Sequence, residues 1–218
     1  MAHQIYYNNE GKEIPSVTQI LKILDKSGII EWANLLGFYK IKYKPFLNEK
    51  ALIGTYVHER IERFFKNEDP LKGEMILDDS ILKKVNIIFN RFIKWQKESK
   101  AIPIKIEESY NNNRYGGTLD CIISVDNIYT LVDFKTGKKP YSIYFLQLGA
   151  YLNLLKELDS DLYNKISFVQ IISLGNGIIV ETKTIDNMIK YQKAFDLVYN
   201  IYTTWSDILL EDWGESIE

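Results

Sequence analysis

Apolar and polar side chains alternate along residues 118–138, TLDCIISVDNIYTLVDFKTGK, on both sides of an Asp126-Asn127 pair. Such a pair is typical of a two-residue hairpin turn, and alternation with a period of two is typical of a half-buried strand. The pattern predicts strands at about 115–125 and 128–135. One face of the hairpin is apolar and is expected to face the core, with Leu119, Cys121, Ile123, Val125, Ile128, Val132 and Phe134.

Charged side chains occupy the other face of this hairpin. If residues 126–127 form the turn, Asp120 lies directly opposite Asp133, and Lys135 follows on the same face. Like charges that face each other across a ladder destabilise it. The two aspartates therefore need a compensating interaction.

The remaining pattern predicts helices before and after a set of five strands. Ser16 and Gln19 have the spacing of a capping box at the start of the first helix. A short N-terminal hairpin precedes it, and Pro140 marks a later helix start. The expected helices are about 16–26, 29–40, 48–66, Asp79 or Ser80 to Lys97, 140–158 and a final one of about twenty residues, and the remaining strands are about 102–110, 166–173 and 178–183.

This order of elements predicts an α/β fold with a mixed central sheet and helices on both faces. We interpret residues 1–218 as a single domain. Its 1–100 part is mainly helical, its 101–183 part holds the sheet and a helix, and residues 184–218 form a C-terminal helix.

Composition narrows the classes of function. The formal charge is −2, so nucleic acid would have to meet local patches or a metal rather than a basic surface. A single cysteine excludes a disulfide framework, a four-cysteine zinc site and a cysteine-ligated iron–sulfur cluster. The N-terminus lacks the apolar core of a signal peptide, and no run reaches the length of a membrane span. These features indicate a cytoplasmic protein, in the host cytoplasm if it is viral, without a membrane partner.

The facing aspartates gain a chemical purpose if a hard cation lies between them. Mg²⁺ prefers oxygen ligands, commonly one or two carboxylates together with substrate phosphates. Lys135 follows Asp133 by roughly 7 Å along the strand, where its ammonium can stabilise charge on a phosphate. These parts suit metal-assisted hydrolysis of a phosphodiester. The alternatives are a solvated surface hairpin and a structural cation site, although a structural site would not call for Lys135.

Two helical motifs extend the candidate site. His58 follows Gly54 by one helical turn, and we interpret the glycine as allowing close approach to another backbone that brings His58 to the hairpin. Gln147 and Tyr151 are four residues apart and share a face of the helix that follows Lys135. The alternatives are a buried histidine bonded to a carbonyl and a tyrosine that packs in the core.

In sequence order these residues resemble a known family. The series Gly54-x-x-x-His58, Gly117-Thr118-Leu119-Asp120, Asp133-Phe134-Lys135 and Gln147-x-x-x-Tyr151 resembles the motifs of the PD-(D/E)XK nuclease superfamily, and within it the RecB-type exonuclease branch with its small phage and mitochondrial genome-maintenance members. The resemblance covers about residues 16–151. It implies a restriction-endonuclease-like fold and a divalent-metal-dependent deoxyribonuclease that acts in DNA repair, recombination or phage replication.

The resemblance also implies roles for individual residues. It implies Mg²⁺ or Mn²⁺ held by His58, Asp120, Asp133 and the Phe134 carbonyl, with Lys135 as the catalytic lysine. Gln147 and Tyr151 would contact DNA or order Lys135. Some members of the branch hold an iron–sulfur cluster on four cysteines, which this chain with Cys121 alone cannot do.

Weaker candidates lie around this set. Arg114, Tyr115, Gly117 and Lys138 are interpreted as substrate-binding residues, with Gly116-Gly117 letting a sugar–phosphate backbone approach. We interpret Glu107 or Glu108 as a candidate for another carboxylate, and Lys40, Lys42, Lys44 and Lys139 as candidates that line a DNA path with neighbouring aromatics. For each, a solvated surface charge is the alternative.

Two functions of different class follow. The first is a DNA exonuclease that prefers single strands with free ends, because predicted helices at 16–26 and 29–40 can arch over the site and admit a threaded strand. The second is a nuclease-like nucleic-acid-binding module without turnover. Within the enzyme class, an endonuclease of the same fold remains an alternative, and the sequence indicates nothing about protein partners.

Overall fold

The predicted hairpin lies at the centre of a five-stranded sheet. In the computed structural model, which describes residues 4–24, 27–72 and 78–214, β4 (Gly116–Val125) pairs antiparallel with β5 (Ile128–Lys135). Asp126 and Asn127 both have positive φ, at 50° and 65°, as a type I′ turn requires. The hairpin and its turn are therefore confirmed.

The sheet is mixed. Its strand order is β3-β4-β5-β6-β7, with β3 at Ile102–Asn111, β6 at Ile166–Ser173 and β7 at Ile179–Thr184. β5 and β6 are parallel, and the other neighbouring pairs are antiparallel. Parallel strands need a long crossover, which α5 (Ser142–Leu158) and the unpredicted short α6 (Ser160–Lys165) provide.

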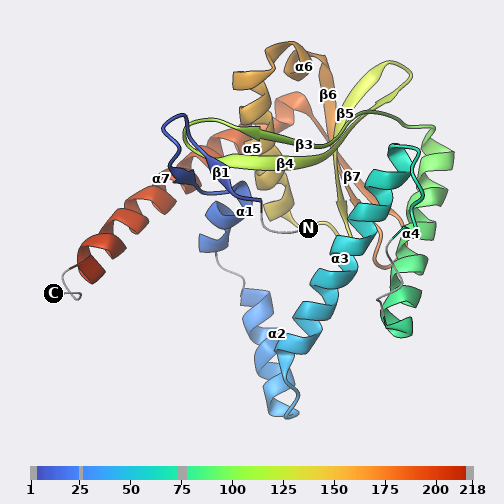
Figure 1. The fold of residues 1–218 in the computed structure, drawn as a ribbon, viewed down its shortest axis with the longest axis horizontal. Helices are drawn as coiled ribbons and strands as arrows, with labels where there is room; N and C mark the ends of the chain where they lie inside the picture. Colours follow the sequence, from blue (N-terminus) through green and yellow to red (C-terminus); the bar gives the residue numbers. More distant parts are fainter. Residues whose placement is uncertain (1–3, 25–26, 73–77, 215–218) are drawn as a thin grey trace.

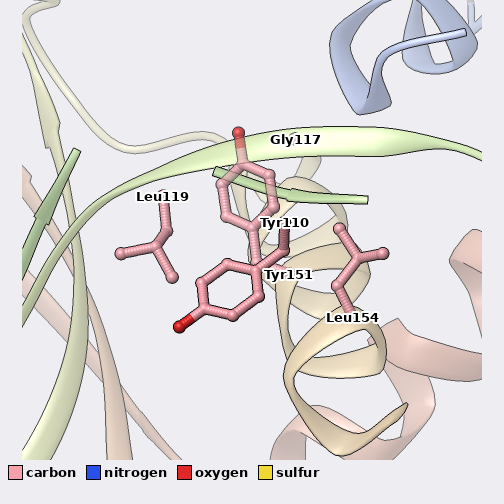
Figure 2. Close-up of a pocket in the computed structure, with 5 residues that line it drawn as sticks. All are labelled: Tyr110, Gly117, Leu119, Tyr151 and Leu154. Atoms are coloured by element: carbon pink, nitrogen blue, oxygen red, sulfur yellow. The ribbon is translucent and has the colours of Figure 1, made fainter. Parts of the chain in front are cut away.

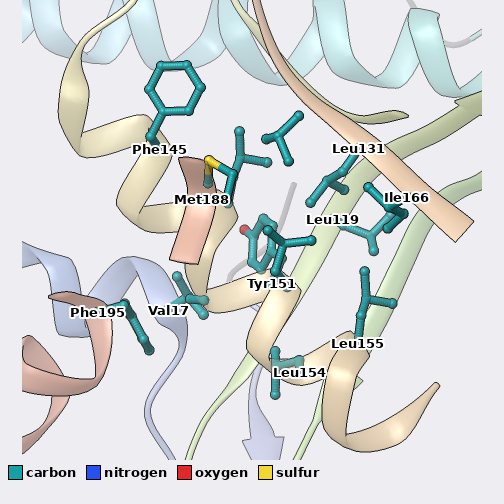
Figure 3. Close-up of a cluster of buried hydrophobic side chains, with 14 of the residues drawn as sticks. Val17, Leu119, Leu131, Phe145, Tyr151, Leu154, Leu155, Ile166, Met188 and Phe195 are labelled. Atoms are coloured by element: carbon teal, nitrogen blue, oxygen red, sulfur yellow. The ribbon is translucent and has the colours of Figure 1, made fainter. Parts of the chain in front are cut away.

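Helices cover both faces of this sheet (Figure 1). α3 (Tyr43–Phe65) and α4 (Asp79–Ser99) pack on one face through Val57, Phe92, Cys121 and other buried apolar residues. α5, α7 (Ile185–Gly214) and the short α1 (Val17–Ile20) pack on the other face. Figure 3 shows this second cluster, in which Leu119, Leu131 and Tyr151 meet between the sheet and α5. The expected α/β fold with a mixed sheet between helical layers is confirmed.

The N-terminal region differs in detail from the prediction. β1 (Tyr6–Tyr7) and β2 (Glu13–Ile14) form the expected hairpin, and Ser16 and Gln19 form the expected capping box. The helix that they start is short, since α1 gives way to a 3₁₀ turn, η1 (Leu21–Ile23), instead of continuing to residue 26.

The next helices also begin at other residues than expected. α2 spans Ser27–Phe38, and α3 begins at Tyr43, five residues before the predicted start at 48. The α4 N-cap is Asp78, whose side chain accepts a hydrogen bond from the Ser80 N–H, rather than Asp79 or Ser80. α2 and the first half of α3 stand out from the sheet as a helical hairpin (Figure 1). Within the described ranges, no helix combines the length and apolar character needed to cross a bilayer.

Candidate functional site

Asp133 and Lys135 form a buried ion pair on the α5 side of β5. Asp133 is fully buried. The Lys135 Nζ donates a hydrogen bond to its Oδ1 at 2.8 Å and lies 2.7 Å from its Oδ2. Burial raises the pKa of Asp133 to about 6, and the Lys135 charge only partly offsets this effect. The carboxylate is therefore held in a place where its charged form is poorly solvated.

Asp120 does not pair with Asp133 across the ladder. The pairing of β4 with β5 ends at Cys121–Val132, one pair before Asp120 and Asp133, whereas the pairing of β5 with β6 on the other edge continues through Asp133–Ile171. The Asp120 Oδ2 turns inward and accepts a hydrogen bond from the Phe134 N–H at 2.8 Å. The prediction that Asp120 lies directly opposite Asp133 is therefore wrong, because the ladder ends before the two carboxylates meet. Burial is the main cause of the raised pKa of Asp133, and the negative charge of Asp120 raises that pKa further.

A local break in alternation places a second carboxylate beside Asp120. Glu107 on β3 lies between the pairs Ile106–Cys121 and Glu108–Leu119, so it is the cross-strand neighbour of Asp120. Its φ is 47°, which is uncommon for a residue other than glycine. At this point the side chains of both strands switch to the opposite face of the sheet. Ile106 and Cys121 pack against α3 and α4, whereas Tyr110 and Leu119 pack in the cluster beneath α5.

The predicted apolar face is corrected at two positions. Cys121, Ile123, Val132 and Phe134 do share one buried face. Leu119 lies on the opposite face, because strict alternation does not continue through Asp120. Ile128 beside the turn is 46% exposed rather than buried.

His58 reaches the two carboxylates from α3. Its Nδ1 lies 3.5 Å from the Asp120 Oδ2 and 3.8 Å from the Glu107 Oε1. Burial disfavours protonation of His58, but the negative charges of Asp120 and Glu107 outweigh it and raise the pKa to about 9. The protonated imidazole thus balances the carboxylate charge at neutral pH.

Gly54 does not have the role expected for it. A Cβ at this position would lie 3.7 Å from the Thr136 Oγ1, which is an ordinary contact with a side chain. The interpretation that Gly54 allows close backbone approach is therefore wrong. α3 nevertheless passes beside Thr136, the residue after Lys135, and this path delivers His58 to the end of β5.

α5 continues the polar contacts on the other side of Lys135. The Lys135 Nζ donates to the Gln147 Oε1 at 3.3 Å, and the Gln147 Nε2 donates to the Tyr151 hydroxyl at 2.8 Å. Tyr151 is only 4% exposed, and burial raises its pKa well above the ordinary value. These contacts fix the orientation of Gln147 and leave Tyr151 inside the protein, beneath the lysine.

The ring of Tyr151 fills the space left by Gly117. A Cβ on Gly117 would lie 2.5 Å from the Tyr151 Cε1 and 3.1 Å from a methyl group of Val17. Figure 2 shows Tyr151 between Gly117 and Leu119, with Tyr110 and Leu154 completing an apolar recess that has no room for a water molecule. The missing side chain of Gly117 therefore makes room for the Tyr151 ring. The prediction that it lets a sugar–phosphate backbone approach is wrong.

The other expected substrate-binding residues are spread out. Tyr115 is fully buried against Phe195 and Tyr199, so it cannot contact a substrate in this structure. Arg114 pairs with Glu157, which lies about 15 Å along α5 from Gln147 by helical rise. Lys138 is exposed just beyond β5, beside Lys139, and it remains a candidate.

A basic and aromatic segment lies at the tip of the α2–α3 hairpin. Phe38 is 80% exposed and Tyr39 is 63% exposed, with their rings in edge contact. Lys40 and Lys42 are exposed in the same turn, and Lys44 lies in the first turn of α3. This tip is about 22 Å from His58 along α3. The structure does not join these lysines to the buried carboxylates.

The donor atoms suit a hard or borderline cation. Among the described residues, His58, Glu107 and Asp120 form a group whose possible ligand atoms all lie within 4.8 Å of one another. The neighbouring Asp133 Oδ2 is buried, and the Lys135 Nζ lies 2.7 Å from it. One imidazole with carboxylate oxygens fits Mn²⁺ or Mg²⁺ better than a softer metal. Phe134 donates its N–H to Asp120, and ligation by its carbonyl stays a prediction.

Comparisons with known proteins add no identity to this geometry. No protein-family model matches the chain, and no curated protein matches it. A solved structure described as the crystal structure of SSO0001 aligns with 69% of this chain and 74% of that chain, at 13% identity and a TM-score of 0.31. A likeness this weak carries no argument about this protein.

Two residues of the site were weakly indicated or missed by the sequence. Glu107 was one of two equal candidates, and only its position opposite Asp120 distinguishes it from Glu108, which pairs with Lys105. Tyr144 was missed, although it precedes Gln147 by three residues on α5. Its ring centre lies 4.8 Å from the Lys135 Nζ. The helical spacing of Tyr144, Gln147 and Tyr151 was the signal that could have found it.

Proposed function

We propose that this protein is a divalent-metal-dependent deoxyribonuclease of the PD-(D/E)XK superfamily and its RecB-type exonuclease branch, with a restriction-endonuclease-like arrangement of its sheet. The observation that carries the proposal is one connected set of contacts. His58 lies beside Asp120, Asp120 accepts from the Phe134 N–H, and Lys135 binds Asp133 and Gln147. These residues come from helices and strands far apart in sequence.

The charges in this set suit phosphodiester hydrolysis. His58, in its neutral form, would hold Mg²⁺ or Mn²⁺ together with Glu107, Asp120 and Asp133, and Phe134 is a further candidate through its carbonyl. A bound metal ion supplies an activated water and stabilises negative charge on the phosphate. Burial lowers the pKa of Lys135, but the Asp133 and Asp120 charges outweigh it and raise the pKa above the ordinary value. Lys135 therefore stays cationic and can stabilise the charge that develops on the phosphoryl oxygens.

Gln147 and Tyr151 act through Lys135. The Gln147 amide accepts from the lysine and donates to the tyrosine hydroxyl, so the lysine head has one preferred position. Preorganised charge of this kind accelerates a reaction because little reorganisation is needed in the transition state. In this proposal Gln147 and Tyr151 are positioning residues, because neither is required to touch the substrate.

A single DNA strand with a free end is the substrate that we favour. The exposed Phe38 and Tyr39 beside Lys40 and Lys42 supply stacking surfaces and positive charge without a broad basic face. Stacking on aromatic side chains tolerates any sequence and needs unpaired bases. The net charge of −2 agrees with contacts that are local.

End-labelled DNA tests the proposal. Linear and circular single strands, and the corresponding duplexes, are incubated with Mg²⁺, Mn²⁺ or EDTA. The proposal predicts metal-dependent shortening of linear single strands, no reaction in EDTA and little cleavage of circles. Circles that are cut as fast as linear strands would make the protein an endonuclease. Binding of DNA without any cleavage would favour a nucleic-acid-binding module without turnover.

A further inference from the structure

A run of alternating lysines and tyrosines leads from the buried ion pair to the protein surface. The Lys135 Nζ lies 4.8 Å from the ring centre of Tyr144. The Tyr144 ring meets the Tyr141 ring edge-to-face, at 5.7 Å between centres and 86° between planes. The Lys139 Nζ then lies 5.4 Å from the Tyr141 ring centre. We call Lys135, Tyr144, Tyr141 and Lys139 the lysine–tyrosine run.

The burial of this run changes along its length. Lys135 is mostly buried, with 19% of its side chain exposed, and Tyr144 is half-buried. Tyr141 is 50% exposed, and Lys139 is exposed. The run therefore begins at the carboxylates and ends in solvent, and residues 136–142 contain no acidic residue that would oppose an anion.

The local backbone holds this run in place. The Leu174 N–H donates to the Lys135 carbonyl at 2.8 Å, and the Gly175 N–H donates to the Gly137 carbonyl at 3.1 Å. Arg91 anchors the same turn by donating to the Leu174 and Gly175 carbonyls. Tyr144 lies in the first turn of α5, directly after this fixed segment. An aromatic surface on a rigid support loses little conformational freedom when it binds a ligand.

We propose that Tyr141 and Tyr144 form the stacking surface for the bases next to the phosphodiester bond that is cut. Tyr141 offers an exposed ring to a base, and Lys139 beside it, with the exposed Lys138 next to Lys139 in sequence, meets the backbone phosphates. Tyr144 borders Lys135 and acts as a positioning residue for its ammonium through a cation–π contact. The ligand is a single strand of any sequence, because every base has a face that can stack.

This inference rests on the proposed nuclease function and deepens it. The half-buried Tyr144 alone would be explained by packing beneath Lys135. Packing does not explain why Tyr141, the N-cap residue of α5, remains half exposed and in contact with a second lysine, since its side chain makes no capping hydrogen bond. The matched control is Tyr7, a 52% exposed tyrosine on β1 that is not part of the lysine–tyrosine run.

Two measurements test the surface with the full-length protein. The first compares KM and kcat on a labelled linear single strand in Mn²⁺ for Y141L, Y141F, Y144L, Y144F and Y7L. The second adds protein to a strand with 2-aminopurine near its end, in EDTA, and records the loss of fluorescence that stacking causes. Y141L should raise KM by about tenfold with little change in kcat, as expected for the loss of one stacked base.

The remaining variants separate stacking from structure. Y144L should lower kcat, since Lys135 loses its aromatic neighbour, and Y144F should restore kcat because it keeps the ring. Y141F and Y7L should behave as the wild type. Quenching of 2-aminopurine should disappear in Y141L and persist in Y141F. If Y144L does not fold, Y141L still decides the matter, because its side chain is at the surface.

The failures of the two ideas are distinguishable. A wild type that cleaves DNA, with Y141L and Y144L that keep its KM and kcat, would overturn the stacking surface and leave the nuclease proposal standing. A wild type that cleaves nothing would overturn the nuclease proposal, and the surface would then be judged by the 2-aminopurine signal alone. Equal quenching in Y141L and wild type would count against stacking.

Discussion

Glu107 on β3 lies across the ladder from Asp120 on β4, and both carboxylates approach the same His58 nitrogen, at 3.8 Å and 3.5 Å. Glu107 reaches this position with a positive φ of 47°, at the point where both strands change the faces of their side chains. A backbone conformation of this kind costs energy and persists where the surrounding structure holds it. We therefore expect the Glu107 side chain to contribute to the metal site.

Glu107→Gln should lower the affinity for Mn²⁺ by about tenfold or more, the scale reported for groups that support a metal site. The matched control is Glu108→Gln, since Glu108 is adjacent in sequence but pairs with Lys105. Isothermal titration calorimetry measures both affinities. Equal Mn²⁺ binding by the two variants would remove Glu107 from the site.

Asp133→Asn should leave metal-free stability level or raise it at roughly pH 7.5. The folded pKa of Asp133 is raised from its ordinary value of 3.8 to about 6 by burial. A carboxyl whose pKa is raised by folding binds its proton more tightly in the folded state, so the wild type gains stability as the pH falls through about 6. The advantage of the variant should therefore shrink toward about pH 5. Thermal unfolding in EDTA at several pH values measures it.

Added Mn²⁺ should reverse this order. The wild type should be stabilised by the ion through mass action, and Asp133→Asn should gain much less. A variant that is clearly less stable than the wild type in EDTA, yet cleaves DNA normally, would show that Asp133 serves the fold alone.

Lys135→Met should bind a single strand within a few-fold of the wild type but cleave it about 10²-fold more slowly, the scale of one preorganised electrostatic contact. Lys94→Met is the control, because Lys94 on α4 is 68% exposed and pairs only loosely with Glu98. Single-turnover cleavage and fluorescence anisotropy separate rate from affinity. Wild-type cleavage by Lys135→Met would contradict the role given to the lysine.

Two glycines should respond in opposite ways to alanine. Gly117→Ala should destabilise the fold by about 1–3 kcal/mol, because its Cβ would overlap the Tyr151 ring at 2.5 Å in a filled space. Gly54→Ala should be neutral or stabilising by up to about 1 kcal/mol, since alanine is favoured in helices and its Cβ would meet Thr136 at 3.7 Å. Denaturant unfolding compares them. A stable Gly117→Ala would contradict the packing role of Gly117.

The sequence predicted the elements of this fold better than it predicted the side-chain directions at the site. Alternation and the Asp126-Asn127 turn were sufficient for the β4–β5 hairpin, because both signals are local. The same alternation placed Leu119 on the wrong face, because no local signal marks the positive φ of Glu107. The prediction that Asp120 lies opposite Asp133 was wrong for a related reason. The antiparallel pairing ends where the Asp120 side chain accepts a hydrogen bond from the Phe134 N–H, and alternation alone does not predict this contact.

Residues brought together by packing were the hardest to assign. Gly117 and Tyr115 look like surface residues of a turn in the sequence. In the structure, the Tyr151 ring occupies the space beside Gly117, and Tyr115 is buried against α7. Only the arrangement of α5, α7 and β4 decides these environments. His58, Lys135 and Gln147 were easier, because each carries a functional group on a helix or strand whose direction the sequence pattern already predicts.

Cleavage of a labelled single strand by wild type and Asp120→Asn, prepared identically and assayed in Mn²⁺ and in EDTA, tests the central claim most directly. Asp120 lies beside His58 and Glu107 and accepts a hydrogen bond from the Phe134 N–H, so the proposed function requires its carboxylate for a metal bound there. We predict that the wild type shortens the strand in Mn²⁺ and stops in EDTA, and that Asp120→Asn leaves it intact in both. Cleavage by the wild type in EDTA, or equal cleavage by Asp120→Asn in Mn²⁺, would contradict the account.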